Sequence, residues 1–342
     1  IQTGPESAGS EPGPACYGKG GEEPTNTDCQ IVLGRIDPDF YLGGELTVDA
    51  SLSRKALSEK IGSHYGWTAE ESAANMYMVA MANLMMAMRI QTVARGWDPR
   101  DFAIVPYGGG GSLYACDLAR ELGAETVVVP PLPGYASAYG AIRVDMKQEF
   151  TAPIHRVEEE IDFDWLNREF DALVDRAVAI LKSEGIPAAD IVVERLVDVK
   201  YFSQSRFFTV GVEPGRIADL GAITVSFMAA MKDAYGYTLP PGYAPVEVEN
   251  LRVVVRGRIV KPDLQPIETK TTIEDARMPR RNVWFKDVGF VPTDIYRRHL
   301  LPPGATFDGP AILEQHDTTV VMPPRTHCRV DNYGNLIIQV ER

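Results

Sequence analysis

The sequence has no apolar run of the roughly 18 residues that a membrane-spanning helix needs. Its first residues, Ile-Gln-Thr-Gly-Pro, include no Met, no basic region and no apolar core, so no signal peptide is visible. Cationic residues are in the minority, because 34 Lys and Arg stand against 47 Asp and Glu, for a net charge of −13. This acidic balance disfavours nucleic acid and anionic membranes as partners.

Cysteine is also scarce: Cys16, Cys29, Cys116 and Cys328 are widely spaced. No Cys-x-x-Cys pair is present, so a zinc framework is not expected, and no other set of metal ligands stands out. We expect four reduced, mostly buried thiols, which is the usual condition in a cytoplasmic protein.

The sequence offers few candidates for catalysis. The five histidines are isolated, and Ser112 lacks the Gly-x-Ser-x-Gly elbow of hydrolases. Glu6 and Asp28 are candidates for acid–base chemistry, because both lie in glycine-rich loops instead of on solvated helix faces. Both fit helix capping equally well, and Asp28 could cap a short helix at 31–34.

The 342 residues, of which 45% are hydrophobic, suffice for two or three domains with cores of their own. We expect a boundary near residue 150, which gives domains 1–150 and 151–342. Two strand–loop–helix units in the first domain predict an α/β layer. Their strands are expected at 102–105 and 126–129, and their helices at 112–123 and 135–145.

Two longer helices are also predicted. The first, at 69–95, starts with a capping box of Thr68 and Glu71, and its methionine cluster at 76–88 is expected in the core. A pliable ligand surface is the alternative for these methionines. The second helix is expected at 163–185. The strands expected after it make the second domain α+β and largely β: 192–201, 207–212, 246–260, 282–285, 311–313, 318–322 and 336–340.

The most informative stretch is the glycine loop, defined as Gly108, Gly109, Gly110, Gly111 and Ser112. It has neither the Lys-[Ser/Thr] pair of a Walker A loop nor the third glycine of Gly-x-Gly-x-x-Gly. Glycines between a strand and a helix allow close approach of a ligand to backbone N–H groups. A nucleotide-binding loop and a tight structural turn both fit this pattern.

A series of glycine-rich and polar stretches runs in order along nearly the whole chain. In the first domain they are Gly4-Pro-Glu-Ser-Ala-Gly9, Pro12-Gly-Pro-Ala-Cys-Tyr-Gly18, Pro24-Thr-x-Thr-Asp28, Leu33-Gly-Arg35, Leu42-Gly-Gly44, Gly96-x-Asp-Pro-Arg100, the glycine loop and Pro133-Gly-x-x-Ser-Ala-x-Gly140. In the second they are Ala234-Tyr-Gly-Tyr237, Val248-Glu-Asn-Leu-Arg252, Tyr296-x-Arg-x-x-Leu-x-Pro-Gly304, Gly309-Pro-Ala-Ile312 and Asp331-x-x-Gly-Asn-Leu336. Together they resemble the hydantoinase A/5-oxoprolinase family.

The resemblance implies the second half of an actin-like, sugar-kinase-type (ribonuclease H-like) ATPase domain, followed by the β-rich C-terminal domain of the family. It also implies ATP as cofactor, with Mg²⁺ or another divalent cation. In such proteins ATP phosphorylates an amide or carbonyl oxygen. The glycine loop resembles the adenosine-binding turn, so Gly108 to Ser112 would pack against adenine and ribose and would not hold phosphate.

Two departures from the family pattern are visible. The two phosphate loops of Asp-x-Gly-Gly-Thr type are absent from the chain, so it is expected to be inactive alone and to form part of a longer or split subunit. The family usually has Gly-Gly-Ala-Gly-Pro-Leu-His-Ala, and Tyr114 stands here in place of the histidine. That change is expected in a carboxylase-type or a catalytically reduced member.

Three functions follow from the resemblance. The first is the ATP-binding subunit of a hydantoinase/oxoprolinase-type enzyme that hydrolyses cyclic amides. The second is the ATP-binding subunit of an acetone/acetophenone-type ketone carboxylase, and the third is a non-catalytic scaffold subunit. The expected partners are an N-terminal phosphate-loop part, a hydantoinase B-like subunit and a small cyclic amide or ketone.

Overall fold

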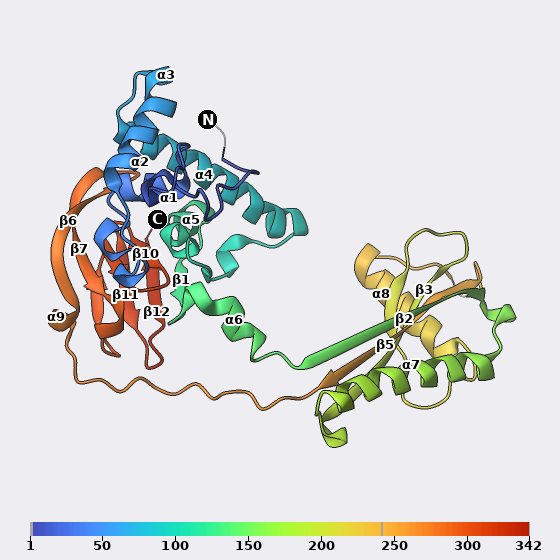
Figure 1. The fold of residues 1–342 in the computed structure, drawn as a ribbon. Helices are drawn as coiled ribbons and strands as arrows, with labels where there is room; N and C mark the ends of the chain where they lie inside the picture. The colour runs from blue at the N-terminus through green and yellow to red at the C-terminus, as the bar shows by residue number, and fades with distance from the viewer. Residues whose placement is uncertain (1–2, 241, 342) are drawn as a thin grey trace. The chain divides into compact units, whose positions relative to one another are not determined.

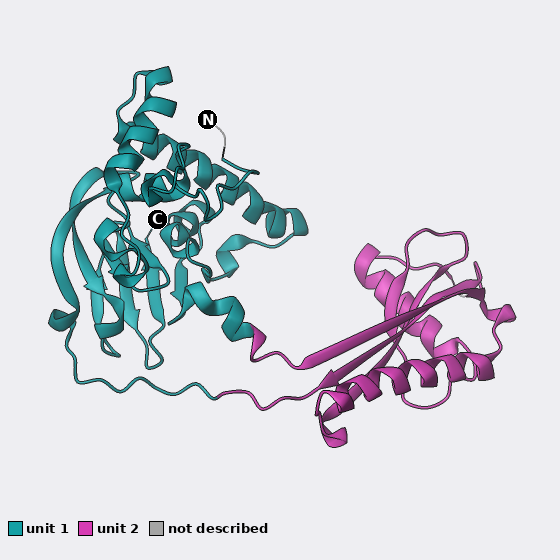
Figure 2. Cartoon of the chain, viewed as in Figure 1, with its two compact units in different colours: residues 1–140, 263–342 teal, residues 141–262 magenta. Residues whose placement is uncertain are grey.

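The computed structural model describes residues 3–240 and 242–341, and they form two compact units (Figures 1 and 2). Unit 1 combines residues 1–140 with residues 263–342, and unit 2 consists of residues 141–262. The chain therefore leaves unit 1 once and returns to it. No helix in the described ranges is both long enough and apolar enough to cross a bilayer.

The helices of unit 1 follow local sequence signals. They are α1 (Asn26–Val32), α2 (Ala50–Leu57), α3 (Ser63–Tyr65), α4 (Ala69–Gln91), α5 (Ala115–Leu122), α6 (Ala136–Ala141) and α9 (Ile273–Ala276). The predicted capping box of Thr68 and Glu71 begins α4, because each side chain accepts the other residue's backbone N–H. At Gly123 the backbone turns left-handed (φ 74°) and ends α5, as predicted.

The methionine cluster of α4 is only partly in the core. Met76 and Met81 are buried with Ala73, Tyr77 and Ala80 on one face of the helix. Further along, Met86 is 60% exposed, so the expectation of a core helix is wrong for the last turns. The helix also ends at Gln91, before the predicted residue 95.

Two sheets complete unit 1. The first has the order β1-β12-β11-β8, with all neighbours antiparallel: β1 (Thr126–Val129), β12 (Leu336–Val340), β11 (Thr326–Val330) and β8 (Thr306–Asp308). The second has the order β10-β9-β7-β6, and only β7 and β9 are parallel: β10 (Thr319–Met322), β9 (Ala311–Glu314), β7 (Gly289–Arg297) and β6 (Arg277–Phe285).

The second sheet lies between two cores. On β9, Ile312 packs with α1 and α4, whereas its neighbour Leu313 packs with β1 and β12. Side chains of adjacent strand residues point to opposite faces, so this strand is buried on both sides. Residues 111–113 and helix α5 contact β10 of this sheet.

Unit 2 is a sheet of order β2-β5-β3-β4 with two helices, α7 (Phe163–Ser183) and α8 (Gly221–Tyr235). Its antiparallel strands are β2 (Met146–Val157), β5 (Val246–Gly257), β3 (Ile191–Tyr201) and β4 (Phe208–Gly211). Phe170 of α7 and Phe227 of α8 are buried in one core with Leu251 of β5. The predicted helix at 163–185 is confirmed by α7. Helix α8 was not predicted, because it has no side-chain cap and carries the β-branched residues Ile223, Thr224 and Val225 near its start.

The compact units divide the chain differently from the boundary predicted near residue 150. The reason is long-range strand pairing: β12, near the end of the chain, pairs with β1 over the whole length of β1. Residues 263–342 consequently share a core with the first domain, and the predicted β-rich second domain is split between the two units.

The predicted strand at 102–105 is wrong. Ile104 forms a single parallel bridge with Val127, while Phe102 is 47% and Val105 is 54% exposed. An apolar run becomes a buried strand only if neighbouring strands pair with it, and this run has one bridge. Of the predicted α/β layer, only the bridge between Ile104 and Val127 joins the two expected strands. The strand that pairs with β1 is the antiparallel β12.

All four cysteines are free and buried, as expected. Burial raises the pKa of the Cys16 and Cys328 thiols to about 12, and for Cys16 the nearby Asp28 carboxylate adds to the effect. Burial likewise raises the pKa of Cys29 and Cys116.

These raised pKa values predict slow thiol chemistry. At pH 8, a thiol with a pKa near 12 is ionised to on the order of one part in ten thousand, against roughly a quarter for a free thiol. We expect a disulfide reagent at pH 8 to modify all four cysteines in denaturant, but in the native protein only at the rate of unfolding. Modification of a native thiol within seconds would contradict this prediction.

Candidate functional site

The glycine loop forms a turn that other segments of unit 1 hold on both sides. Gly108 has a left-handed backbone (φ 78°), and its N–H donates to the Pro133 carbonyl (2.7 Å). The Thr318 hydroxyl donates to the Gly109 carbonyl (2.7 Å). The end of the loop belongs to a 3₁₀ turn, Gly111–Leu113, and α5 follows this turn. The predicted helix thus begins three residues late, after this turn.

The buried guanidinium of Arg35 fixes the turn that follows the loop. It donates to the Leu113 carbonyl (3.4 Å) and the Trp284 carbonyl (3.1 Å), and it pairs with Asp117 (3.5 Å). It also lies 4.0 Å from the centre of the Tyr77 ring. One side chain therefore connects α4, α5 and β6 around the base of the glycine loop.

Gly110 and Gly111 of the loop line a cavity of about 490 Å³, here called the neutral cavity. Its other walls include Asn26 and Gln30 of α1, Asn83 and Leu84 of α4, Leu118 of α5, and Tyr114 just before α5. No described residue that lines this cavity carries a charged side chain, in a chain whose net charge is −13. The carboxamide of Gln30 and the hydroxyl of Tyr114 are both buried beside this cavity.

A second cavity, of about 270 Å³, also borders the glycine loop, and Gly110 lines both. It is here called the charged cavity, because Asp37, Glu314, His316 and Asp317 line it. Glu314 is buried and accepts from Arg281 and Arg297, both at 2.5 Å. The Tyr135 hydroxyl and His316 Nδ1 are 3.0 Å apart. The two cavities therefore differ sharply in polarity.

Asp28 has a structural position. It is fully buried, and its two oxygens accept from five donors at 2.7–3.2 Å: the backbone N–H groups of Ala15, Cys16 and Thr25, and the hydroxyls of Thr25 and Ser53. It completes a capping box with Thr25 at the start of α1, so the helix that it stabilises begins earlier than the predicted 31–34. The carboxylate joins the glycine-rich N-terminal loop to α1 and α2, which favours the capping alternative over acid–base chemistry.

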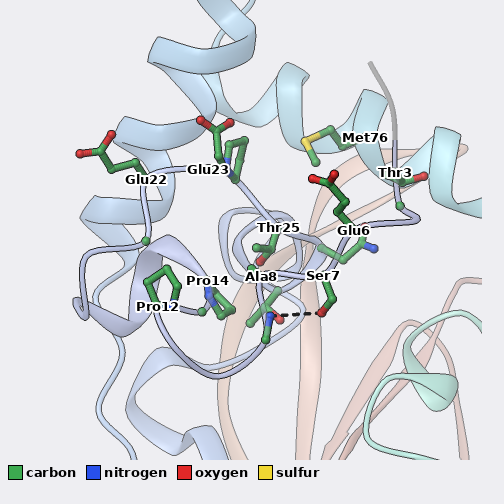
Figure 3. Close-up of a pocket in the computed structure, with 17 residues that line it drawn as sticks. Thr3, Glu6, Ser7, Ala8, Pro12, Pro14, Glu22, Glu23, Thr25 and Met76 are labelled. Atoms are coloured by element: carbon green, nitrogen blue, oxygen red, sulfur yellow. Dashed lines mark hydrogen bonds between the residues drawn. The ribbon is translucent and has the colours of Figure 1, made fainter.

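Glu6 lies elsewhere. It is exposed and lines a cavity of about 630 Å³ together with Ser7, Thr25 and Met76 (Figure 3). In the same stretch, the Gly9 N–H donates to the Ser7 hydroxyl (3.1 Å; Figure 3). This cavity shares Thr3, Gly4, Asn26 and Thr27 with the neutral cavity, and no residue of the glycine loop lines it. The structure thus does not bring Glu6, Asp28 and the loop together in one site.

Unit 2 contains one group of potential metal ligands. Ligand atoms of His155, Glu247 and Glu249 lie within 4.8 Å of one another. The Lys200 ammonium is already among them, 2.5 Å from Glu249 and 3.7 Å from Glu247, and these contacts raise the pKa of Lys200. We interpret this group as a surface ion-pair cluster, because the ammonium takes the place that a cation would need.

The sequence did not single out Gln30 and Asn83, which line the neutral cavity. The signal for Gln30 was a single amide inside the apolar run Cys29–Leu33, which is unusual for a buried helix face. Asn83 gave no signal, because its position opposite the glycine loop depends on how α4 packs against α1.

Comparison with known proteins defines the class. The hydantoinase/oxoprolinase family matches residues 1–150, and the hydantoinase/oxoprolinase C-terminal domain matches residues 154–339. The chain therefore belongs to the hydantoinase/oxoprolinase family, which confirms the resemblance. The two matches meet near residue 150, at the boundary that the sequence predicted, although the compact units divide elsewhere.

Particular relatives have different activities. The chain is 29% identical to caprolactamase subunit alpha of Pseudomonas jessenii over 97% of its length, and to acetophenone carboxylase gamma subunit of Aromatoleum aromaticum over 99%. In each case it covers 48% of the relative. The chain thus spans about half the length of these relatives.

Solved structures share its mixed α/β fold. The chain aligns with nucleotide-free acetone carboxylase at a TM-score of 0.84 and 24% identity, covering 99% of this chain and 49% of that one. It aligns with the ATP-dependent caprolactamase of Pseudomonas jessenii at a TM-score of 0.76 and 27% identity, covering 99% and 50%.

The contacts of Asp28 predict the effect of its replacement. Asp28→Asn replaces one acceptor oxygen by an NH₂ group that faces donors, so we expect the free energy of unfolding to fall by about 2–5 kcal/mol. Denaturant unfolding measures the change, and the exposed Asp39→Asn serves as control. Unchanged stability combined with loss of enzyme activity would instead support a catalytic role.

Proposed function

We propose that this chain is part of the ATP-binding subunit of a hydantoinase/oxoprolinase-type enzyme that uses ATP to hydrolyse a cyclic amide. The observation that carries the proposal is the neutral cavity, whose wall includes the glycine loop. In this proposal the cavity takes the adenine and ribose of ATP.

The lining of the neutral cavity supports binding of the base and ribose there and of the phosphates elsewhere. A base and a ribose are uncharged, and they suit apolar and amide side chains such as Leu84, Leu118 and Asn83. A triphosphate needs cationic groups or many backbone N–H groups, and this lining has no cation. We therefore assign the phosphates to a different part of the enzyme.

The partner in this proposal is an N-terminal part with the two phosphate loops, together with a hydantoinase B-like subunit. ATP chemistry requires a divalent cation such as Mg²⁺ to shield the phosphates. The neutral cavity offers no carboxylate for that cation, so the residues present there do not fit it. This chain's own contribution is to bind and orient the nucleoside.

The chemical class of the reaction rests on the relatives. Transfer of the γ-phosphoryl group to an amide oxygen makes the carbonyl carbon more electrophilic. Water can then add, after which the C–N bond breaks and phosphate leaves. The similarity to caprolactamase subunit alpha supports a cyclic amide as substrate.

A ketone carboxylase is the second candidate. The similarity to the acetophenone carboxylase gamma subunit is as high as that to caprolactamase subunit alpha, at 29% identity in both cases. Nucleotide turnover in the assembled complex tests the two candidates. ATP hydrolysis stimulated by caprolactam, hydantoin or 5-oxoproline supports the first, whereas stimulation only by acetone or acetophenone with bicarbonate supports the second.

The glycine loop yields a direct prediction. A Cβ at Gly110 would meet no atom within 4 Å, so Gly110→Val fits the fold and puts a branched side chain at the border of the neutral and charged cavities. We expect ATP affinity in the assembled complex to fall at least about tenfold, equivalent to ~1.4 kcal/mol, by calorimetry.

The matched control is Gly211→Val in unit 2, where a Cβ also meets open space. It should leave ATP affinity unchanged. Equal affinities of the wild type, the Gly110 variant and the control would reject the glycine loop as part of the nucleotide site.

A further inference from the structure

The glycine loop has four glycines in a row, so its backbone needs contacts from outside to hold one shape. Glycine loses more conformational freedom on ordering than any other residue. A Cβ at Gly108 or at Gly110 would meet no atom within 4 Å, so the space beside these two residues is open. The shape of the loop therefore depends on hydrogen bonds to its backbone.

The turn between β9 and β10 contacts the loop directly. Thr318 in this turn is 7% exposed, and its hydroxyl donates to the Gly109 carbonyl (2.7 Å). A Cβ at Gly109 would lie 3.4 Å from the carbonyl oxygen of Asp317, so loop and turn approach closely here. The Thr318 hydroxyl thus fixes the second residue of the loop to the second sheet.

The preceding residue of the turn, Asp317, holds the segment that contacts the first residue of the loop. Its carboxylate accepts from the Gly134 N–H (2.7 Å), and a Cβ at Gly134 would lie 2.6 Å from its side chain. The neighbouring Pro133 carbonyl accepts from the Gly108 N–H (2.7 Å). Asp317 therefore acts on the loop through residues 133 and 134.

A buried arginine anchors Asp317 in turn. Arg298 is 7% exposed and donates to the carbonyls of Val129 (2.8 Å) and Pro130 (2.6 Å), where β1 ends. It also donates to the Gln315 carboxamide (2.6 Å), whose Nε2 donates to the Asp317 carboxylate. The turn that holds the loop is thus connected to strands of both sheets of unit 1.

We propose that Asp317 and Thr318 are positioning residues that pre-organise the glycine loop for the nucleoside of ATP. This inference rests on the proposed function, since it assumes that the nucleoside binds beside Gly110 and Gly111. A loop that has one shape before the ligand arrives loses less conformational entropy on binding, so its affinity is higher. The inference also gives the charged cavity a role, because two residues of its wall hold the loop while the neutral cavity takes the nucleoside.

The test measures ATP affinity by calorimetry, and KM for ATP and kcat by ATP hydrolysis, on the intact complex that contains this chain. Thr318→Val keeps the shape of the side chain and removes its hydroxyl. We expect it to weaken ATP binding and raise KM about three- to tenfold, with kcat changed less than about twofold, because the contact acts on binding alone. Asp317→Ala should raise KM by a similar factor, whereas Thr318→Ser keeps the hydroxyl and should behave as the wild type does.

A second substitution separates positioning of the loop from a general structural role. The backbone of Gly109 lies outside the left-handed region, and an added methyl group would lie on the side of the charged cavity, near Asp317. Gly109→Ala therefore fits and restricts the loop backbone. Combined with Thr318→Val, it should recover about two- to fivefold of the lost ATP affinity. The control Thr306→Val makes the valine change at an exposed residue of β8 and should leave ATP affinity unchanged.

The outcomes distinguish this inference from the proposed function. If Gly110→Val weakens ATP binding while Thr318→Val and Asp317→Ala bind ATP as the wild type does, the positioning role is overturned and the nucleotide site stands. If Thr318→Val lowers kcat and Tm without a change in ATP affinity, or if Gly109→Ala recovers no affinity, the role is structural and the inference is overturned. If none of these variants affects ATP binding, the proposed site itself fails, and the inference with it.

Discussion

The structure around the glycine loop depends on one buried cation, the guanidinium of Arg35. Burying a charge is costly unless it is paired and hydrogen-bonded. Arg35 pairs with Asp117 and donates from Nε and Nη1 to two backbone carbonyls, while its Nη2 has no hydrogen bond among the described residues. The preceding Gly34 makes that position possible: its φ is 72°, and a Cβ would lie 2.4 Å from the Asn282 carbonyl oxygen. The close approach of α1 to β6 thus places the cation where α4, α5 and the loop meet.

Around this cation, the loop separates two environments of opposite character. One side is the neutral cavity, and the other is the charged cavity, where Glu314 is held by Arg281 and Arg297. The lining of the neutral cavity suits uncharged groups, whereas the charged cavity carries the carboxylates of Asp37, Glu314 and Asp317. In the proposed function, this chain recognises the nucleoside, and the phosphoryl chemistry depends on groups that another part of the enzyme provides.

Much of the fold could be read from local signals, and the wrong strand prediction has a long-range cause. The capping box at Thr68, the apolar periodicity of α7 and the left-handed Gly123 involve residues within a turn or two of each other. The apolar run at 102–105 looked like a buried strand because its composition suits one. Whether such a run pairs depends on segments far along the chain, and here β1 took β12 as its neighbour instead.

By itself, the sequence determined the family, the capped start of α4, the left-handed end of α5 and the buried state of the four thiols. These properties depend on composition and on neighbours in the chain. The tertiary structure decided that Asp28 is buried among five hydrogen-bond donors, that Glu6 lines a different cavity from the loop, and that Gln30 and Tyr114 line a cavity with Gly110 and Gly111. A cavity is bounded by residues many turns apart, so only the packing of α1, α4 and the glycine loop could bring its polar groups together.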